Sequence, residues 1–147
     1  MASNEFSVGR DCQLVVMGPF GRVDLSHVTG FDSRQQTASI RIDRIDGRQM
    51  AAELPKGWEG MFELERGSSA ADDFIARIEA AYEQGGAVPA GTLYQYIAEP
   101  DGSTSTYQYD GAVFRFAQAG QWRGDASVRQ RLEFFASSRR RIEWGRI

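Results

Sequence analysis

Residues 37–54 read TASIRIDRIDGRQMAAEL, and this stretch indicates the fold class. Apolar and polar residues alternate on both sides of Asp46-Gly47, which is the period of a β-strand. An Asp-Gly pair between two alternating runs is the strongest short signal for a two-residue hairpin turn. The sequence therefore predicts a β-hairpin with strands at 37–45 and 48–54.

The two faces of this predicted hairpin differ in polarity. Ala38, Ile40 and Ile42 share one face, because side chains two residues apart on a strand point the same way. Arg41 and Asp43 lie on the other face, which is therefore charged.

Alternation also predicts strands on both sides of the hairpin. Upstream, the tight connection Gly18-Pro19-Phe20-Gly21 joins two further strands into a first hairpin. Downstream, the strand period resumes after the turn-like Gly57-Trp58-Glu59-Gly60, and again after Pro89. The predicted strands outside the central hairpin are 12–17, 22–28, 61–66, 93–97, 104–109, 112–117 and 128–136.

One segment has the helical period instead. Between residues 67 and 85, apolar side chains recur every three or four positions and form a single stripe. Ser69 is suited to cap the helix, with Asp72 three residues later, and Gly85-Gly86 are suited to end it. The stripe consists of Ala71, Phe74, Ile75, Ile78, Ala81 and Tyr82.

Length and composition predict one domain over residues 1–147. A chain of 16.4 kDa with 41% hydrophobic and 25% charged residues matches ordinary globular usage. The predicted fold is mainly β with one short α-helix, arranged as a β-sandwich or small barrel of about eight antiparallel strands. Some strands are apolar on both faces: Phe134 lies on one face of the last strand and Phe135 on the other. Either a second sheet or a neighbouring subunit covers the second face.

Composition also excludes several classes of protein. One cysteine, Cys12, and one histidine, His27, leave no cluster for a metal and no disulfide. The first residues do not resemble a signal peptide, and no apolar run reaches the ~18 residues that span a bilayer. We therefore expect a soluble protein that starts in the cytoplasm, with no membrane contact and no cofactor.

No combination of residues predicts catalysis. Asp24, Ser26 and His27 are the three residue types of a hydrolase triad, but on a strand His27 projects to the opposite face and is expected at the core edge. Glu63 and Glu65 are expected to lie at a solvated strand edge. Asp72 and Asp73 are expected at the start of the helix, where carboxylates are favoured. The first hairpin has too few glycines for a phosphate-binding loop. Cys12 is expected to be an inert core residue.

Charge is distributed unevenly along the chain. Net charge is −3 with a pI near 5.2, which argues against a dedicated DNA-binding protein. Residues 1–114 have a net charge of −8, whereas residues 115–147 have a net charge of +5. Nearly all of the basic residues are arginine. The run Arg139-Arg140-Arg141 with Trp144 is compatible with a nucleic-acid patch. Docking on an acidic neighbour is the favoured interpretation.

These elements, in this order, resemble a bacteriophage tail tube protein, a family similar to the tubes of type VI secretion and contractile injection machines. The residues that prompt the resemblance are 23–31, the charged hairpin at 40–47, and the stretches 57–64 and 130–138. The resemblance implies a tail-tube-like domain flanked by the helix.

It also implies hexameric rings that stack into a hollow tube, through which the genome passes without specific binding. Sheath, baseplate and tape-measure proteins would be partners, and the location would be the virion tail, assembled in the host cytoplasm. Arg41 and Asp43 are candidates for the lumen. The subunit-interface candidates are Arg129, Arg131, Phe135, Arg139, Arg140, Arg141 and Trp144.

An alternative of another class is a monomeric ligand-binding module or small enzyme. Aromatic side chains suit small ligands, although tyrosine is common on any strand. This hypothesis places five aromatic residues around one cleft, namely Tyr94, Tyr96, Tyr107, Tyr109 and Trp122.

Overall fold

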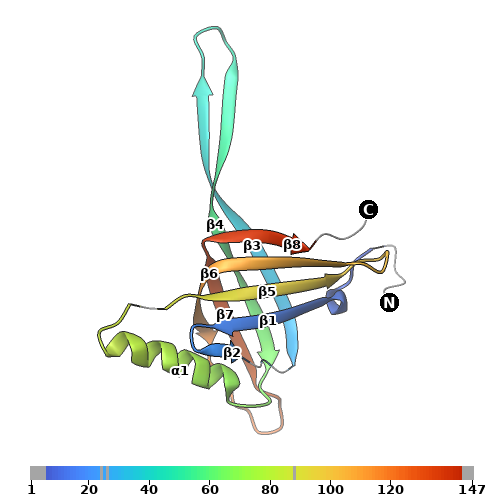
Figure 1. Ribbon diagram of the computed structural model, residues 1–147, viewed down its shortest axis with the longest axis vertical. Helices are drawn as coiled ribbons and strands as arrows, with labels where there is room; N and C mark the ends of the chain where they lie inside the picture. Colours follow the sequence, from blue (N-terminus) through green and yellow to red (C-terminus); the bar gives the residue numbers. More distant parts are fainter. Residues whose placement is uncertain (1–5, 24, 26, 88, 144–147) are drawn as a thin grey trace.

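The computed structural model describes residues 6–23, 25, 27–87 and 89–143, and its elements are antiparallel strands, one α-helix and a short 3₁₀ turn (Figure 1). This mainly β composition confirms the predicted fold class. In chain order the elements are η1 Gly9–Asp11, β1 Cys12–Gly18, β2 Gly21–Val23, β3 Val28–Asp43, β4 Gln49–Glu65, α1 Ala70–Glu83, β5 Gly91–Ala98, β6 Thr104–Gln118, β7 Arg129–Ala136 and β8 Ser138–Glu143.

All eight strands belong to one bent sheet. Its order is β2-β1-β5-β6-β7-β4-β3, and β8 pairs with the first half of β6. Strand β6 pairs with β5 and β8 up to its middle and with β7 beyond it. The two ends of the sheet therefore cross, with β3, β4 and β7 behind β1, β5 and β6 in Figure 1.

The sheet bends where Gly111 interrupts β6. Gly111 has a φ of 61°, a left-handed conformation that glycine adopts without a Cβ penalty. Ser137, between β7 and β8, donates hydrogen bonds from its backbone N–H and its hydroxyl to the Asp110 carbonyl, at 2.9 and 3.0 Å. The bend in β6 and the break between β7 and β8 thus coincide at one corner.

Gly111→Ala is expected to lower the free energy of unfolding by about 1–2 kcal/mol, the cost of a left-handed backbone for a residue with a Cβ. The new Cβ would also lie 2.5 Å from the Ser137 Oγ. Gly124→Ala is the matched control, because an added Cβ there meets nothing within 4 Å. Urea denaturation of both variants measures the difference, and equal losses would contradict this account of the corner.

The core lies between the crossed ends of the sheet. Phe31 of β3 stacks on Phe134 of β7 at 5.8 Å and meets the ring of Tyr109 from β6 edge-on at 6.3 Å. Helix α1 contributes Phe74, whose ring lies 5.3 Å from that of Phe114. The helix therefore covers one end of the core and leaves the outer faces of the sheet uncovered.

Several predicted strands are parts of longer ones. The predicted strand at 61–66 continues the second hairpin strand within β4, and the glycines at 57 and 60 lie inside it rather than in a turn. Strands 104–109 and 112–117 are the two halves of β6. Bulges and bends interrupt the alternation of apolar and polar residues without ending a strand. The prediction of separate strands within β4 and within β6 is therefore wrong.

Other predicted boundaries also change. The first hairpin is confirmed, but its return strand β2 ends at Val23 instead of reaching residue 28. Strand β3 begins at Val28, nine residues before its predicted start. Strand β8 was not predicted, because its run of three arginines does not alternate with apolar residues.

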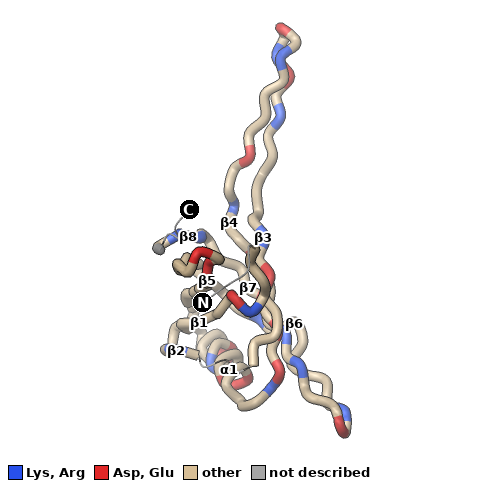
Figure 2. The backbone as a smooth tube through the Cα atoms, turned by 90° about the vertical axis from the view of Figure 1, so that its right-hand side faces the viewer, with Lys and Arg blue, Asp and Glu red and all other residues tan. Residues whose placement is uncertain are grey.

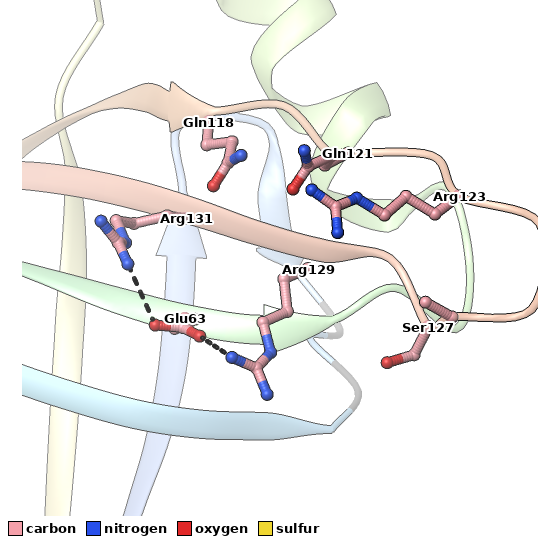
Figure 3. A pocket seen from close by; sticks show the side chains of 8 residues that line it. Glu63, Gln118, Gln121, Arg123, Ser127, Arg129 and Arg131 are labelled. Carbon is pink, nitrogen blue, oxygen red and sulfur yellow. Dashed lines mark hydrogen bonds and ion pairs between the residues drawn. The ribbon is translucent and has the colours of Figure 1, made fainter.

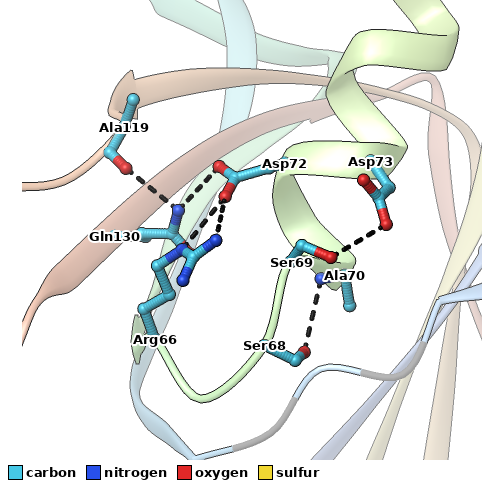
Figure 4. A network of polar contacts seen from close by, with 8 residues as sticks. All are labelled: Arg66, Ser68, Ser69, Ala70, Asp72, Asp73, Ala119 and Gln130. Carbon is cyan, nitrogen blue, oxygen red and sulfur yellow. Dashed lines mark hydrogen bonds and ion pairs between the residues drawn. The ribbon is translucent and has the colours of Figure 1, made fainter.

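The helix is confirmed, but its start differs from the prediction. Ser69 donates to the Asp73 carboxylate at 3.1 Å instead of accepting a bond from a helix N–H. Asp72 points away from the cap: it pairs with Arg66 at 3.0 Å and accepts from Gln130 at 2.9 Å (Figure 4). This pairing joins α1 to β7.

The helix ends as the sequence predicts. Gly85 has a φ of 85°, and its N–H donates to the Tyr82 carbonyl at 3.0 Å. The Gly86 N–H donates to the Ala81 carbonyl at 3.2 Å, which completes a glycine C-cap.

Candidate assembly surfaces

The far halves of β3 and β4 form a hairpin that projects well beyond the body of the protein (Figures 1 and 2). Residues 39–56 are all exposed. At the tip, the Gly47 N–H donates to the Arg44 carbonyl at 3.0 Å, and Asp46 accepts from the Arg48 N–H at 3.0 Å. The predicted hairpin is thus confirmed, but its turn runs from Arg44 to Gly47, and the strands end at Asp43 and begin at Gln49 instead of flanking a two-residue Asp46-Gly47 turn.

One face of this hairpin is entirely apolar. Residues that pair across an antiparallel ladder share a face, and Ala38 pairs with Leu54, Ile40 with Ala52, and Ile42 with Met50. The larger side chains are 41–55% exposed. We call the six residues Ala38, Ile40, Ile42, Met50, Ala52 and Leu54 the hairpin apolar face.

This apolar face does not continue the protein's own core. On β3 the core-facing residues are Phe31 and Ser33, both in contact with Tyr109. Ala38 and Ile40 lie on the opposite face, because alternation along β3 is uninterrupted. On β4, a bulge at Lys56, next to Gly57 with its φ of 116°, brings Leu54 to that same face.

The other hairpin face is polar and internally bonded. Ser39 donates to the Glu53 carboxylate at 2.6 Å and Thr37 donates to it at 2.8 Å, and these bonds lower the pKa of Glu53. The lumen candidates Arg41 and Asp43 lie on this face and are exposed, as predicted from the alternation.

A second polar surface covers the outer side of β4 and β7. Arg129 pairs with Glu65 at 2.9 Å and Glu63 at 3.6 Å, and Arg131 pairs with Glu63 at 3.5 Å (Figure 3). Hydrogen bonds from Ser127 and Arg129 lower the pKa of Glu65. Strand β4 lies between β7 and β3, so Glu63 and Glu65 lie on a face in the middle of the sheet and not at its edge, and both are paired with arginine.

A cavity of about 300 Å³ opens beside these pairs, at the loop between β6 and β7 (Figure 3). It is lined mainly by polar side chains, including Arg123 and Gln121 from the loop. The charge pairs continue across the sheet, where Arg115 of β6 pairs with Glu133 of β7. Phe135, an interface candidate on the same strand, is exposed.

The arginine run at the C-terminal end folds onto its own chain as β8. The Arg139 guanidinium lies 3.6 Å from the centroid of the Tyr107 ring and 4.6 Å from that of Trp58, where cation–π attraction holds it. Arg140 pairs with Asp110 at 2.6 Å and lowers the pKa of that carboxyl.

Part of this basic segment therefore contacts its own chain. Arg141 also bonds within the chain, donating to the Ser105 hydroxyl at 3.2 Å. Trp144 lies outside the described residues. Reversal of residues 139–141 to glutamate would disturb β8 itself, so it is a poor test of docking between subunits.

The structure does not form the predicted aromatic cleft. Tyr94 and Tyr96 stack at 6.3 Å on the outer face of β5, whereas Tyr109 is fully buried on the inner face of β6. Burial raises the pKa of Tyr109. Trp122 lies on the β6–β7 loop, beside Arg66. Because neighbouring side chains on a strand point to opposite faces, these residues are separated, and the prediction of a single aromatic cleft is wrong.

The remaining residues considered for chemistry are also apart. His27 is exposed with a φ of 57°, so its expected place at the core edge is wrong; Asp24 and Ser26 lie outside the described residues. Cys12 is half-buried, and its sulfur accepts from the Gln95 amide at 3.4 Å. No group of three metal-binding side chains occurs in the described part of the chain.

A cavity of about 620 Å³ lies between β1 and β3, at the open seam of the sheet. Its lining is mostly apolar or uncharged, with Arg22 as its one charged group among the described residues. A lone cation supplies neither a nucleophile nor a general base. Across 6–23, 25, 27–87 and 89–143, no helix has the length and apolarity required to cross a bilayer.

No protein-family profile and no curated protein sequence matches the chain. Solved structures do match it. A chain from the structure of the anti-feeding prophage cap, its tube terminating cap, has a TM-score of 0.64 and 12% identity, over 98% of this chain and 95% of that one.

Two further matches come from the extracellular contractile injection system PVC in its extended state. A chain of its sheath-tube complex has a TM-score of 0.61 and 12% identity, over 97% of this chain and 95% of that chain. A chain of its sheath/tube terminator has a TM-score of 0.60 and 13% identity, over 93% of this chain and 97% of that chain. The chain therefore has the fold of contractile injection system components, which confirms the expected tail-tube-like resemblance at the level of the fold.

Proposed function

We propose that this protein is a structural subunit of the tube of a phage tail or a related contractile injection machine. The observation that supports this most strongly is the hairpin apolar face. Six apolar side chains are held on a two-stranded arm, away from the core, and no described part of the monomer covers them. A protein exposes such a patch when a partner buries it.

The position of the arm favours a head-to-tail assembly. It projects along the long axis of the molecule, and the β6–β7 loop lies at the opposite end (Figure 2). Contact between two different patches on neighbouring copies is heterologous, and it produces closed rings or open stacks. We infer hexameric rings that stack around a channel, in keeping with the tube terminating cap and the sheath-tube complex that share the fold.

Partners and location follow from the same inference. Sheath and baseplate proteins are proposed as neighbours, because the similar chains come from sheath-tube and baseplate complexes. A tape-measure protein and passing DNA are proposed for the channel, and the virion tail, assembled in the host cytoplasm, for the location. No enzymatic role is proposed, because the residues considered for catalysis lie apart or in ion pairs.

Two polar surfaces suit the channel wall. Arg41 and Asp43, on the polar hairpin face, remain the lumen candidates. The paired charges on β4 and β7, including Arg129 and Arg131 with Glu63, provide a second candidate. A wall whose charges are already paired offers few binding sites to a passing molecule, which favours sliding. Phe135 lies on this second surface and remains an interface candidate.

An assembly driven by the hairpin apolar face should not be weakened by salt. Most arginines considered for docking are paired within the chain, and exposed charges are screened at ionic strengths of ~0.1–1 M. We expect sedimentation velocity to give the same or stronger association when sodium chloride rises from ~0.05 to ~1 M. A loss of association at high salt would contradict an apolar contact and favour the arginine surfaces.

A further inference from the structure

The outer face of β1 and β5 is a second candidate docking surface, partly exposed and of mixed polarity, and it is distinct from the hairpin. Across these strands Gln13 pairs with Tyr96, Val15 with Tyr94, and Met17 with Thr92. Met17 is 38% exposed, and the two tyrosines stack on each other. We call the six residues Gln13, Val15, Met17, Thr92, Tyr94 and Tyr96 the β1–β5 platform.

The platform faces away from the core. The intervening residues Val16 and Leu93 are buried on the inner side of the sheet. Figure 1 views the outer side directly, with no described strand or helix lying over β1 and β5. The described chain therefore has an uncovered sheet face on the body as well as the one on the arm.

We propose that the hairpin apolar face of one copy packs on the β1–β5 platform of a second copy. This inference rests on the proposed self-assembly and identifies its receiving surface. The two surfaces match in size, since each is two strands wide and three cross-strand pairs long. Sheets that pack face to face lie ~10 Å apart with interdigitated side chains, and two faces of equal extent pack without leaving either partly exposed.

Their chemistry is also complementary. Branched aliphatic side chains and Met50 on the arm would meet the rings of Tyr94 and Tyr96, and methionine sulfur makes favourable contacts with aromatic rings. The tyrosine hydroxyls can reach water at the edge of the contact. Beyond Tyr94 the sheet becomes polar, with Gln108 and then Arg140 in the next positions.

A single copy cannot make this contact with itself. The arm extends from the body roughly across the direction of β1 and β5, and its tip is far from these strands (Figures 1 and 2). Each copy therefore offers one arm and one platform to two different neighbours. Such an arrangement extends from copy to copy, as ring or stack formation requires.

Cysteine cross-linking of the full chain tests the contact. In a Cys12→Ser background, one variant has Ile42→Cys on the arm, another has Met17→Cys on the platform, and a third has both. A bifunctional maleimide with a span of about 10 Å, the spacing of packed sheets, is added to each. The double variant is expected to give a ladder of covalent oligomers, and a mixture of the two single variants only dimers.

The control combines Met17→Cys with Asp43→Cys, which places the arm cysteine on the polar face. A ladder at least tenfold weaker than that of the Ile42→Cys pair is expected. Rings or tubes seen by electron microscopy, with cross-linking no stronger than in this control, would overturn the platform as the receiving surface and leave the proposed assembly intact. A chain that sediments as a monomer at every concentration would overturn both.

Discussion

The double substitution Ile40→Asp with Ile42→Asp is expected to abolish self-association. Both side chains lie on the hairpin apolar face, where nothing in the described chain covers them. Burial of an isoleucine contributes about 1.5–3 kcal/mol, so two lost contacts weaken each contact between subunits about a hundredfold or more. Burial of two carboxylates would add a further penalty. Sedimentation velocity at matched concentrations measures the loss.

The matched control is Ala51→Asp, which adds a carboxylate to the polar face of the same hairpin. Ala51 pairs with Arg41 across the ladder, so the new charge faces an arginine and water. We expect this variant to associate like the wild type, and both variants to retain wild-type circular dichroism. Equal loss of association in the two variants would mean that charge on the arm, rather than its apolar face, controls assembly.

Leu132→Ala is expected to have the largest effect on the folded monomer. Leu132 is fully buried in β7, opposite Phe62 of β4 and Phe116 of β6. Removal of a buried leucine side chain typically costs about 2–5 kcal/mol, because a cavity remains in the core. Urea denaturation of the variant measures this loss as a shift of the transition midpoint.

Leu54→Ala provides the contrast, because it makes the same chemical change on the arm. Leu54 is 41% exposed, and exposed substitutions usually change stability by less than about 0.5 kcal/mol. We expect nearly wild-type unfolding of the monomer but weaker association. A large loss of monomer stability in Leu54→Ala would show that the arm belongs to the core and is not reserved for a partner.

Local patterns in the sequence predict the elements of this fold well. The presence of the hairpin, the stripe of α1 and the glycine end of this helix all depend on residues close together in the chain, so propensity and spacing suffice. Strand continuity depends on pairing instead. The bulge near Gly57 and the bend at Gly111 interrupt the local pattern, and only the partner strands show that β4 and β6 continue through them.

The candidate surfaces were predictable only in part. Alternation places Ile40 and Ile42 on one face, but their lack of any cover follows from how far the arm projects from the body. Arg139 was expected to dock on a neighbour, whereas pairing of β8 with β6 places it over the Tyr107 ring. That contact joins residues 32 positions apart, and nothing in the local sequence indicates it.

Self-assembly into a hollow structure is the central claim, and negative-stain electron microscopy of the purified protein tests it most directly. Images taken over a series of increasing concentrations are predicted to show rings or tubes of uniform width. The Ile40→Asp/Ile42→Asp variant, imaged in parallel, is predicted to remain dispersed. Wild-type protein that stays monomeric at every concentration, indistinguishable from this variant, would contradict the account.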